Sequence, residues 1–335
     1  MVENTLAIYQ NPKGFDVDFD LLQEFENGLD PNHPENNRVP CRVLGYGEIS
    51  TVFEIQVESM SGLAFKRMGI FETKEEVDEY LVTYQLYNRL LVDEIGLNLP
   101  AHGHAAFVNK GGYPVFYIIQ QKIPAPAIGN KAIHVLPTQD TLVLFRCVLR
   151  ELFKIWKFNQ RQSDFELGID GQVSNWIIQN FNSNQPKLTS DAELTYLDTS
   201  TPFIRTNGVE QLDPELFLRS APSFLAWILR ILYLGEVMDR YYDFRKVVID
   251  LLANCCKEQM PELIPELVEV ANGFFATQAR HLDIEPIQEK EVFAYYREDA
   301  LIWVLYLWMR RFDRFLYRYI LFRPYPHILP GKTKR

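Results

Sequence analysis

The chain is organised around one short stretch, Gly168-Ile169-Asp170-Gly171-Gln172-Val173-Ser174-Asn175, and the apolar run Trp176-Ile177-Ile178 follows it at once. Asp170 precedes Asn175 by five positions. Glycine and small polar residues favour turns, and a short apolar run favours a buried strand. We therefore predict a polar loop that leads into a strand. By itself the stretch admits two interpretations: turn residues with polar caps, or a loop whose two polar side chains carry chemistry.

Length and composition are those of a globular protein with room for two lobes. The 335 residues exceed the usual size of one domain, and the hydrophobic fraction of 47% is ordinary. The net charge of −10 argues against general nucleic-acid binding, which usually shows as a basic domain. Binding of a nucleotide needs only a few local positive charges, so that function remains open.

The N-terminal residues and the cysteines favour a cytoplasmic protein. Residues 1–5 have neither the basic nor the apolar part of a secretory signal, and the apolar run 300–309 is too short to span a bilayer. The four cysteines have no C-x-x-C spacing, so we expect reduced thiols and neither a zinc site nor disulfides.

A glycine turn between two strand patterns begins after Cys41. The segment Gly45-Tyr46-Gly47 is followed by Ser50 and a second strand pattern, and residues 63–68 form a third that carries Lys66. Glycines let the backbone approach a phosphate closely. The alternatives are an ordinary hairpin and a strand lysine whose charged end reaches solvent.

A helix is predicted over residues 73–92, because apolar residues recur there at helical spacing. Acidic residues crowd its first turns: Glu75, Glu76, Asp78 and Glu79. They suit the positive end of the helix dipole, which is one explanation for them. The other is that one of them pairs with Lys66.

Residues 109–112 form a hairpin signal, and the strand pattern after it ends in the extended connector Gln121-Lys122-Ile123-Pro124. A long amphipathic helix is predicted over residues 139–162. Beyond the central stretch, a strand over residues 194–197 runs into Asp198, which lies 23 positions after Asn175. Asp198 either opens a turn or supplies a carboxylate to the same site as Asn175.

The rest of the chain is helical in pattern, with helices predicted over residues 214–234, 237–257, 262–279 and 293–322. Residues 310–335 are basic and aromatic, with a net charge of +7. We expect the aromatic residues of this segment in the core and its arginines paired with acidic residues. Contact with an anionic membrane is the alternative.

Together these features resemble the protein-kinase-like superfamily over residues 40–200. The matching residues, in chain order, are Gly45-Tyr46-Gly47, Lys66, Glu79, Asp170 with Asn175, and Asp198. No A-P-E signature or long activation segment follows Asp198. The likeness is therefore closer to the small-molecule branch, such as aminoglycoside and choline kinases, within a bacterial kinase-like family.

The resemblance implies an α+β, two-lobe protein-kinase-like fold. Residues 1–37 would be an N-terminal extension of polar, irregular character. Residues 38–122 would form a small antiparallel β lobe with one helix, and residues 123–335 a larger, mostly helical lobe.

The resemblance also implies a phosphotransferase that uses ATP and Mg²⁺ and acts on a hydroxyl of a small molecule. Asp170 would be the catalytic base. Asn175 and Asp198 would hold the metal. Lys66 would bind the α- and β-phosphates, positioned by Glu79 or, alternatively, by Glu76.

The nucleotide would be held by two further segments. Gly45, Gly47 and Ser50 would lie over its phosphates, and backbone groups near Gln121 and Ile123 would bind its adenine. The implied partner is a small-molecule acceptor; no nucleic-acid partner is expected. The acceptor, the oligomeric state and the choice between ATP and GTP stay open.

Two departures from the kinase pattern favour a second interpretation. Gly168 stands where the usual histidine would precede Asp170 by two positions, and Asp198 is followed by Thr199-Ser200 in place of Phe-Gly. The alternative is a pseudokinase, a binding or scaffolding module with little or no turnover.

Overall fold

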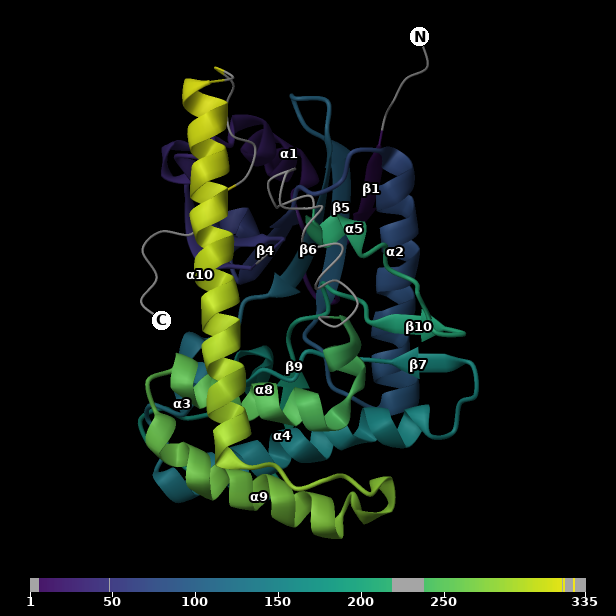
Figure 1. Ribbon diagram of the computed structural model, residues 1–335. Helices are drawn as coiled ribbons and strands as arrows, with labels where there is room; N and C mark the ends of the chain where they lie inside the picture. Colours follow the sequence, from purple (N-terminus) through teal and green to yellow (C-terminus); the bar gives the residue numbers. More distant parts are fainter. Residues whose placement is uncertain (1–5, 48, 219–237, 321, 323–327, 329–335) are drawn as a thin grey trace.

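The structure is a computed structural model that describes residues 6–47, 49–218, 238–320, 322 and 328. An antiparallel sheet with its helices forms one part of the molecule, and a larger, mostly helical part follows it in the chain (Figure 1). The predicted α+β class, with a small β lobe followed by a larger helical lobe, is confirmed. Residues 219–234 of the predicted helix over residues 214–234 lie outside the described residues.

The small lobe is built on a six-stranded sheet in which every neighbouring pair is antiparallel. Its order is β1-β5-β6-β4-β3-β2. The strands are β1 (Ala7–Gln10), β2 (Cys41–Tyr46), β3 (Thr51–Ile55), β4 (Leu63–Met68), β5 (His102–Val108) and β6 (Pro114–Gln121). The sheet thus includes the hairpins predicted around Gly47 and around residues 109–112.

Two helices cover opposite faces of this sheet. Helix α1 (Phe19–Gly28) packs Leu22 and Phe25 on one face, and α2 (Lys74–Arg89) packs on the other. Strand β6 shows the alternation directly, since Tyr117 lies in the α1 core and Phe116 in the α2 core. Successive side chains of a strand point to opposite faces, so one strand serves both cores.

The segment before residue 38 is more regular than its polar sequence predicts. Strand β1 pairs with β5, and the fully buried Leu22 and Phe25 of α1 belong to the core of the small lobe. Asp18 caps α1 by accepting a hydrogen bond from the Leu21 N–H. We retain a division of the chain after residue 122 as a proposal, because the sheet ends at Gln121.

The large lobe is a group of helices with short strands inserted between them. Its longer helices are α4 (Thr138–Asn159), α8 (Phe244–Lys257), α9 (Ile264–Thr277) and α10 (Glu289–Tyr319). Its strands are β7 (Phe165–Leu167), β8 (Trp176–Ile178), β9 (Leu194–Tyr196), β10 (Ile204–Thr206) and β11 (Val209–Glu210). Its short turns of helix include α3 (Gly129–Ala132), α5 (Glu215–Leu218) and the 3₁₀ segments η5 (Val173–Asn175) and η6 (Arg240–Tyr242).

One apolar core holds these elements together. It contains Leu149 and Leu152 of α4, Trp176 of β8, and residues from α8 and α9. The central stretch therefore leads into a buried strand, as predicted: β8 is buried throughout and pairs with β9. The structure has the four cysteines free, and three of them, Cys147, Cys255 and Cys256, are buried.

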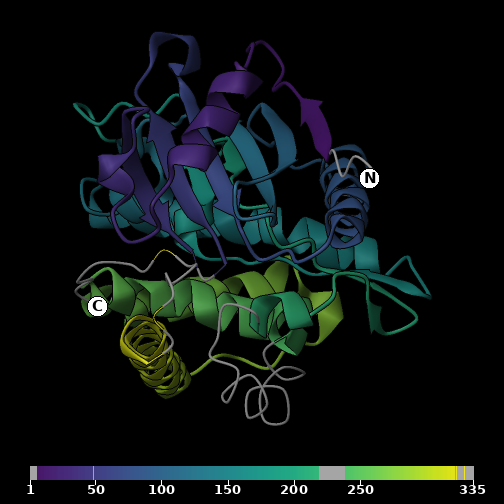
Figure 2. The ribbon, with the colours of Figure 1, turned by 90° about the horizontal axis from the view of Figure 1, so that it is seen from above.

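Helix α10 differs from its prediction. The aromatic residues of segment 310–335 were expected in the core, yet Phe315 and Tyr319 of α10 are exposed by half or more of their surface. The helix is 31 residues long and lies at the edge of the molecule, beside the green helices of the large lobe (Figure 2). It packs on α8 and α9, but the helix is longer than the lobe that it covers (Figure 1). Within the described ranges, the search for helices long and apolar enough to cross a membrane found none.

Candidate functional site

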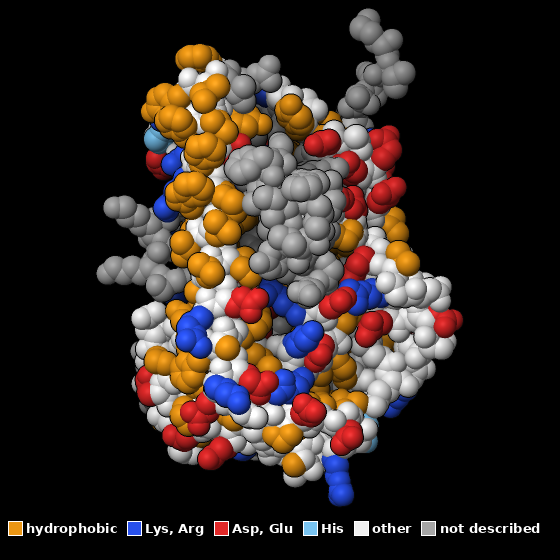
Figure 3. Space-filling view, viewed as in Figure 1, with side chains coloured by type: hydrophobic (Ala, Val, Ile, Leu, Met, Phe, Trp, Pro, Cys, Tyr) orange, Lys and Arg blue, Asp and Glu red, His pale blue; other side chains and the backbone are white. Residues whose placement is uncertain are grey.

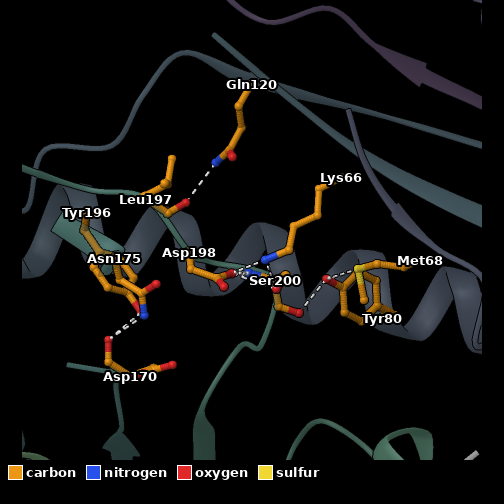
Figure 4. A network of polar contacts seen from close by, with 10 residues as sticks. All are labelled: Lys66, Met68, Tyr80, Gln120, Asp170, Asn175, Tyr196, Leu197, Asp198 and Ser200. Atoms are coloured by element: carbon orange, nitrogen blue, oxygen red, sulfur yellow. Dashed lines mark hydrogen bonds and ion pairs between the residues drawn. The ribbon is translucent and has the colours of Figure 1, made fainter. Parts of the chain in front are cut away.

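An ion pair joins the two lobes between Lys66 of β4 and Asp198, which follows β9. The Lys66 Nζ donates hydrogen bonds to Asp198 Oδ1 at 2.6 Å and to Ser200 Oγ at 2.7 Å (Figure 4). The Lys66 side chain is 14% exposed and that of Asp198 34%. Alternation along β4 explains the direction of the lysine. Lys66 faces the large lobe, whereas Arg67 points to the opposite face and binds Glu26 of α1.

The turn after β9 holds the Asp198 carboxylate in place. Its Oδ1 accepts hydrogen bonds from the Ser200 N–H at 3.1 Å and from the Ser200 hydroxyl at 2.7 Å. Such a turn is typical of an aspartate that binds its own backbone two residues on. Burial raises the pKa of Asp198, but the charge and hydrogen bond of Lys66 and the hydrogen bonds of Ser200 outweigh burial and hold this pKa below its ordinary value. Asp198 is therefore ionised at neutral pH.

The loop around Asp170 is fixed by its backbone. The carbonyl of Gly168 accepts from the Tyr87 hydroxyl at 2.8 Å, that of Asp170 from the Tyr196 hydroxyl at 3.2 Å, and that of Gly171 from the indole of Trp176 at 3.3 Å. The loop thus satisfies its buried polar groups with side chains of the surrounding elements.

Glycine is required at two places in this loop because the Tyr241 backbone and helix α8 pack closely against it. A Cβ on Gly168 would lie 2.8 Å from the Tyr241 carbonyl oxygen, and one on Gly171 would lie 2.6 Å from Val247 of α8. Further along, the Val173 N–H donates to Asn254 Oδ1 of α8 at 2.8 Å. Helix α8 therefore packs against this loop and holds its backbone in place.

Asp170 has a pKa near neutrality. Burial raises the pKa of its carboxyl, the nearby carboxylates of Asp250 and Asp198 raise it further, and the net result is a pKa of about 7. One hydrogen bond, from the Gln172 N–H to Asp170 Oδ1 at 3.1 Å, opposes the shift. A carboxylate with a pKa near the working pH is suited to accept a proton from a hydroxyl.

Asn175 and Asp198 lie at the same end of the β8–β9 hairpin. The Leu197 N–H donates to the Asn175 carbonyl at 2.8 Å, and the Asn175 Nδ2 donates to the Asp170 carbonyl at 3.2 Å (Figure 4). The Asn175 amide oxygen and the Asp198 carboxylate are hard oxygen donors, which is the chemistry that Mg²⁺ prefers. Within the described residues no cluster of three or more His, Cys, Asp or Glu side chains is arranged to hold a metal by itself.

The predicted glycine segment lies at the end of β2, and Ser50 lies just before β3. The Gly47 N–H donates to the Ser50 carbonyl at 2.8 Å, and a Cβ on Gly47 would lie 2.7 Å from the Ser50 hydroxyl oxygen. At Gly45 the register of the β2–β3 pair shifts, and a Cβ there would meet no atom within 4 Å. Ser50 is buried.

The predicted connector leaves the sheet at Gln121. The Gln121 N–H donates to the Ala101 carbonyl and the Lys122 N–H to the Gly62 carbonyl, so both belong to the strand edges. Ile123 is only partly buried, and among the described residues its backbone N–H donates no hydrogen bond. Nearby, the Gln120 side chain donates to the Leu197 carbonyl, next to Asp198, at 3.0 Å.

Glu79 lies away from these residues. Its side chain is exposed, and the described contacts of the Lys66 Nζ are with Asp198 and Ser200, so the predicted pairing of Glu79 with Lys66 is not formed. The alternative, Glu76, serves the helix end: its carboxylate accepts from the Thr73 N–H in a capping box. The physical reason is the helical phase, which turns Tyr80 and Tyr84 toward the sheet and Glu79 toward solvent.

Two tyrosine hydroxyls of α2 donate hydrogen bonds to backbone carbonyls of the large lobe. The Tyr80 hydroxyl donates to the Ser200 carbonyl and the Tyr87 hydroxyl to the Gly168 carbonyl, each at 2.8 Å. They are seven residues apart and thus on one face of the helix. The sequence placed Tyr87 in the apolar face of the helix but gave no signal that its hydroxyl, or that of Tyr80, binds a loop of the large lobe.

Residues 32–314 match the family model described as "Family of unknown function (DUF6206)". The chain belongs to this family. No curated protein sequence matches the DUF6206 chain.

Several solved structures are similar to this DUF6206 protein. One is WaaP in complex with acyl carrier protein, at 12% identity and a TM-score of 0.34, covering 79% of this chain and 99% of WaaP. Another is the GDP complex of aminoglycoside 2'-phosphotransferase-IIIa, at 12% identity and 0.32, covering 71% and 93%. A third is amicoumacin kinase hAmiN with AMP-PNP, Ca²⁺ and Ami, at 12% identity and 0.30, covering 84% and 93%. At TM-scores this low, the likenesses do not decide the function; the residues of the site must do so.

Proposed function

We propose that this protein is an ATP- and Mg²⁺-dependent phosphotransferase that acts on a hydroxyl of a small molecule. The observation that carries the proposal is the convergence of Lys66, Asp198, Asn175 and Asp170 where the two lobes meet. These residues come from elements up to 132 positions apart in the chain. A lysine, two hard oxygen donors and a carboxylate with a pKa near neutrality are the groups that phosphoryl transfer requires.

The residues fit a metal–nucleotide complex by their chemistry. Asn175 and Asp198 supply oxygen donors, and the bound Mg²⁺ would neutralise charge on the phosphate oxygens. Lys66 lies beside them and supplies a positive charge for the α- and β-phosphates. We assign the phosphate contacts of the small lobe to Gly45, Gly47 and Ser50, at the ends of β2 and β3. The backbone N–H of Ile123 is assigned to the adenine.

The other residues orient the acceptor and its proton. Asp170 accepts the proton of the acceptor hydroxyl, since about half of its carboxyl groups are ionised at a pH near 7. Tyr196 and Tyr87 hold the backbone on either side of this carboxylate, so its position does not depend on the acceptor. Catalysis would rest mainly on positioning and on charge stabilisation.

One observation favours a second function, a nucleotide-binding module without turnover. Lys66 is bound by Asp198 and Ser200, and no acidic residue of α2 positions it. If this ion pair persists with nucleotide bound, neither residue is available for the reaction.

The test is the thermal stability of the full chain with ATP, with and without Mg²⁺. Binding to the native state at a hundred times the dissociation constant adds about 2.7 kcal/mol of stability. We expect a Mg²⁺-dependent rise in melting temperature that Lys66→Ala and Asp198→Ala both lose. Lys110→Ala, at the exposed tip of the β5–β6 hairpin, is the matched control and should keep it.

Turnover separates the two functions. ADP formation in the presence of a panel of hydroxylated small molecules supports the phosphotransferase, and it should fall by about 100-fold or more in Asp198→Ala. A nucleotide-dependent shift without ADP formation supports the binding module. The absence of any shift contradicts both.

A further inference from the structure

The outward face of α10 carries a continuous apolar surface. We call it the α10 arc, and its members are exposed by about half or more of their surface: Leu301, Val304, Leu305, Trp308, Phe315 and Tyr319. At 100° per residue the six positions fall within a sector of about 100°, so they lie on one face of the helix. Figure 3 shows apolar side chains along this helix on the outer surface of the molecule.

Single exposed apolar residues are ordinary, but a continuous row of six is not. The arc extends over 19 residues, or about 28 Å at 1.5 Å per residue. It is convex, because it is one side of a helix that lies at the edge of the molecule. A surface of this kind indicates a partner that covers it.

Three exposed arginines line one edge of the arc. At 100° per residue, Arg311, Arg314 and Arg318 fall beside Val304 and Phe315, on the same side of the apolar face. Among residues 300–319 there are four arginines and a single acidic residue, Asp313, which is partly buried. The exposed charge next to the arc is therefore positive, although the chain as a whole has a net charge of −10.

A second copy of the chain is the first occupant to consider, because the spacing of Leu301, Leu305, Trp308, Phe315 and Tyr319 fits a heptad seam. In a parallel pair, Arg311 would face Leu316 of the other copy. In an antiparallel pair, the edge of the helix that carries the arginines would face the corresponding arginine edge of the other copy. Neither arrangement gives these arginines an acidic partner on the helix. The charge pattern therefore disfavours self-association and favours an anionic surface.

We propose that the α10 arc binds the surface of an anionic lipid bilayer. The helix would lie in the plane of the interface, with Leu301, Leu305 and Phe315 among the upper acyl chains. Trp308 and Tyr319 belong to the residue types that favour the level of the headgroups. Arg311, Arg314 and Arg318 would contact the lipid phosphates from the edge of the arc. This surface is separate from the Lys66–Asp198 site, and the proposal does not depend on the proposed activity.

The test is co-sedimentation of the full chain with vesicles. One preparation contains phosphatidylcholine alone and the other contains phosphatidylcholine with phosphatidylglycerol. We expect binding to the anionic vesicles that weakens as salt is raised. The arc variant is Leu305→Ser with Trp308→Ser, and its control is Val82→Ser with Val209→Ser, two apolar residues of similar exposure elsewhere. All four positions are exposed, so the variants should fold.

The charge variant is Arg311→Gln with Arg314→Gln and Arg318→Gln. Its control replaces three exposed arginines outside α10 in the same way: Arg38, Arg89 and Arg161. We expect the arc and charge variants to bind anionic vesicles at least about tenfold more weakly and both controls to bind as the unchanged chain does.

Four outcomes would overturn the proposal. One is no binding of the unchanged chain to anionic vesicles. The second is equal binding to neutral and anionic vesicles, and the third is binding that the arc variant retains. The fourth is a stable dimer in sedimentation velocity that only the arc variant converts to a monomer, since a second copy would then cover the surface.

Discussion

Lys66 Nζ and Asp198 Oδ1 are 2.6 Å apart, although the two residues are separated by 132 positions in the chain. The pair joins the central strand β4 of the small lobe to the loop that follows β9 of the large lobe. It brings together the cation and the anion that the proposed function assigns to the phosphates and to the metal. Its contribution to stability can be measured without knowledge of the acceptor.

We expect a coupling energy of about 1 kcal/mol between Lys66 and Asp198 at pH 7, a modest value because Asp198 is partly exposed. The measurement is a double-mutant cycle in urea with Lys66→Met and Asp198→Asn. The pKa of Asp198 is lowered in the folded chain, so the stabilisation is present above the ordinary aspartate pKa and is lost as pH falls below it. Additive single variants at pH 7 would contradict this expectation.

Asp170 should show the opposite pH dependence. Its pKa is raised to about 7, so the folded state disfavours the ionised form, and this penalty is largest above pH 7 and disappears as pH falls toward 4. We expect Asp170→Asn to be more stable than the unchanged chain at pH 8, on the order of 2–4 kcal/mol. Urea unfolding at pH 8, 6 and 4.5 measures the difference. Asp198→Asn is the control and should be less stable than the unchanged chain at pH 8.

The Tyr80 hydroxyl should act as a tether for the Asp198 turn. Tyr80→Phe removes its hydrogen bond to the Ser200 carbonyl and should cost about 1 kcal/mol of stability. It should also weaken the Mg²⁺-dependent thermal shift with ATP, because Ser200 holds Asp198. Tyr113→Phe is the control, since Tyr113 is an exposed tyrosine of the β5–β6 hairpin. Equal effects of the two variants would argue against a tether.

Glu79 should be dispensable. It is exposed and makes no contact with Lys66, so Glu79→Gln should change stability by less than about 0.5 kcal/mol and leave the nucleotide-dependent thermal shift intact. The comparison is with Lys66→Ala measured in parallel. Loss of the shift in Glu79→Gln would show that α2 turns in the nucleotide complex and that the pairing predicted from the sequence forms there.

The buried pair of Glu26 and Arg67 should be the strongest stability determinant of the small lobe. Arg67 binds both Glu26 oxygens, at 2.6 and 2.7 Å, and the Tyr117 hydroxyl donates to the same carboxylate. Glu26→Gln leaves a buried guanidinium without its counter-charge and should cost about 3–5 kcal/mol. Thermal unfolding measures this cost. Glu35→Gln, an exposed carboxylate, is the control and should change little.

The local features of the chain were predictable from its sequence. Alternating and helical periodicity placed the strands around Lys66, the helix that begins after Thr73, the long helix α4 and the β8–β9 hairpin. Glycine positions marked the turns. The sequence also predicted that Lys66, Asp170, Asn175 and Asp198 act together, but it did so through a family resemblance, because no local pattern relates residues this far apart.

The sequence by itself determined the secondary structure and the kinds of charge available for the site, since both depend on residues close together in the chain. Only the tertiary structure decided which groups meet. Helical phase turns Tyr80 inward and Glu79 outward, so the Tyr80 hydroxyl binds the Ser200 carbonyl and Glu79 stays away from Lys66. The extent of the large lobe leaves Phe315 and Tyr319 of α10 exposed, although the sequence alone predicts their burial. Both results depend on packing between distant elements, which local propensity does not encode.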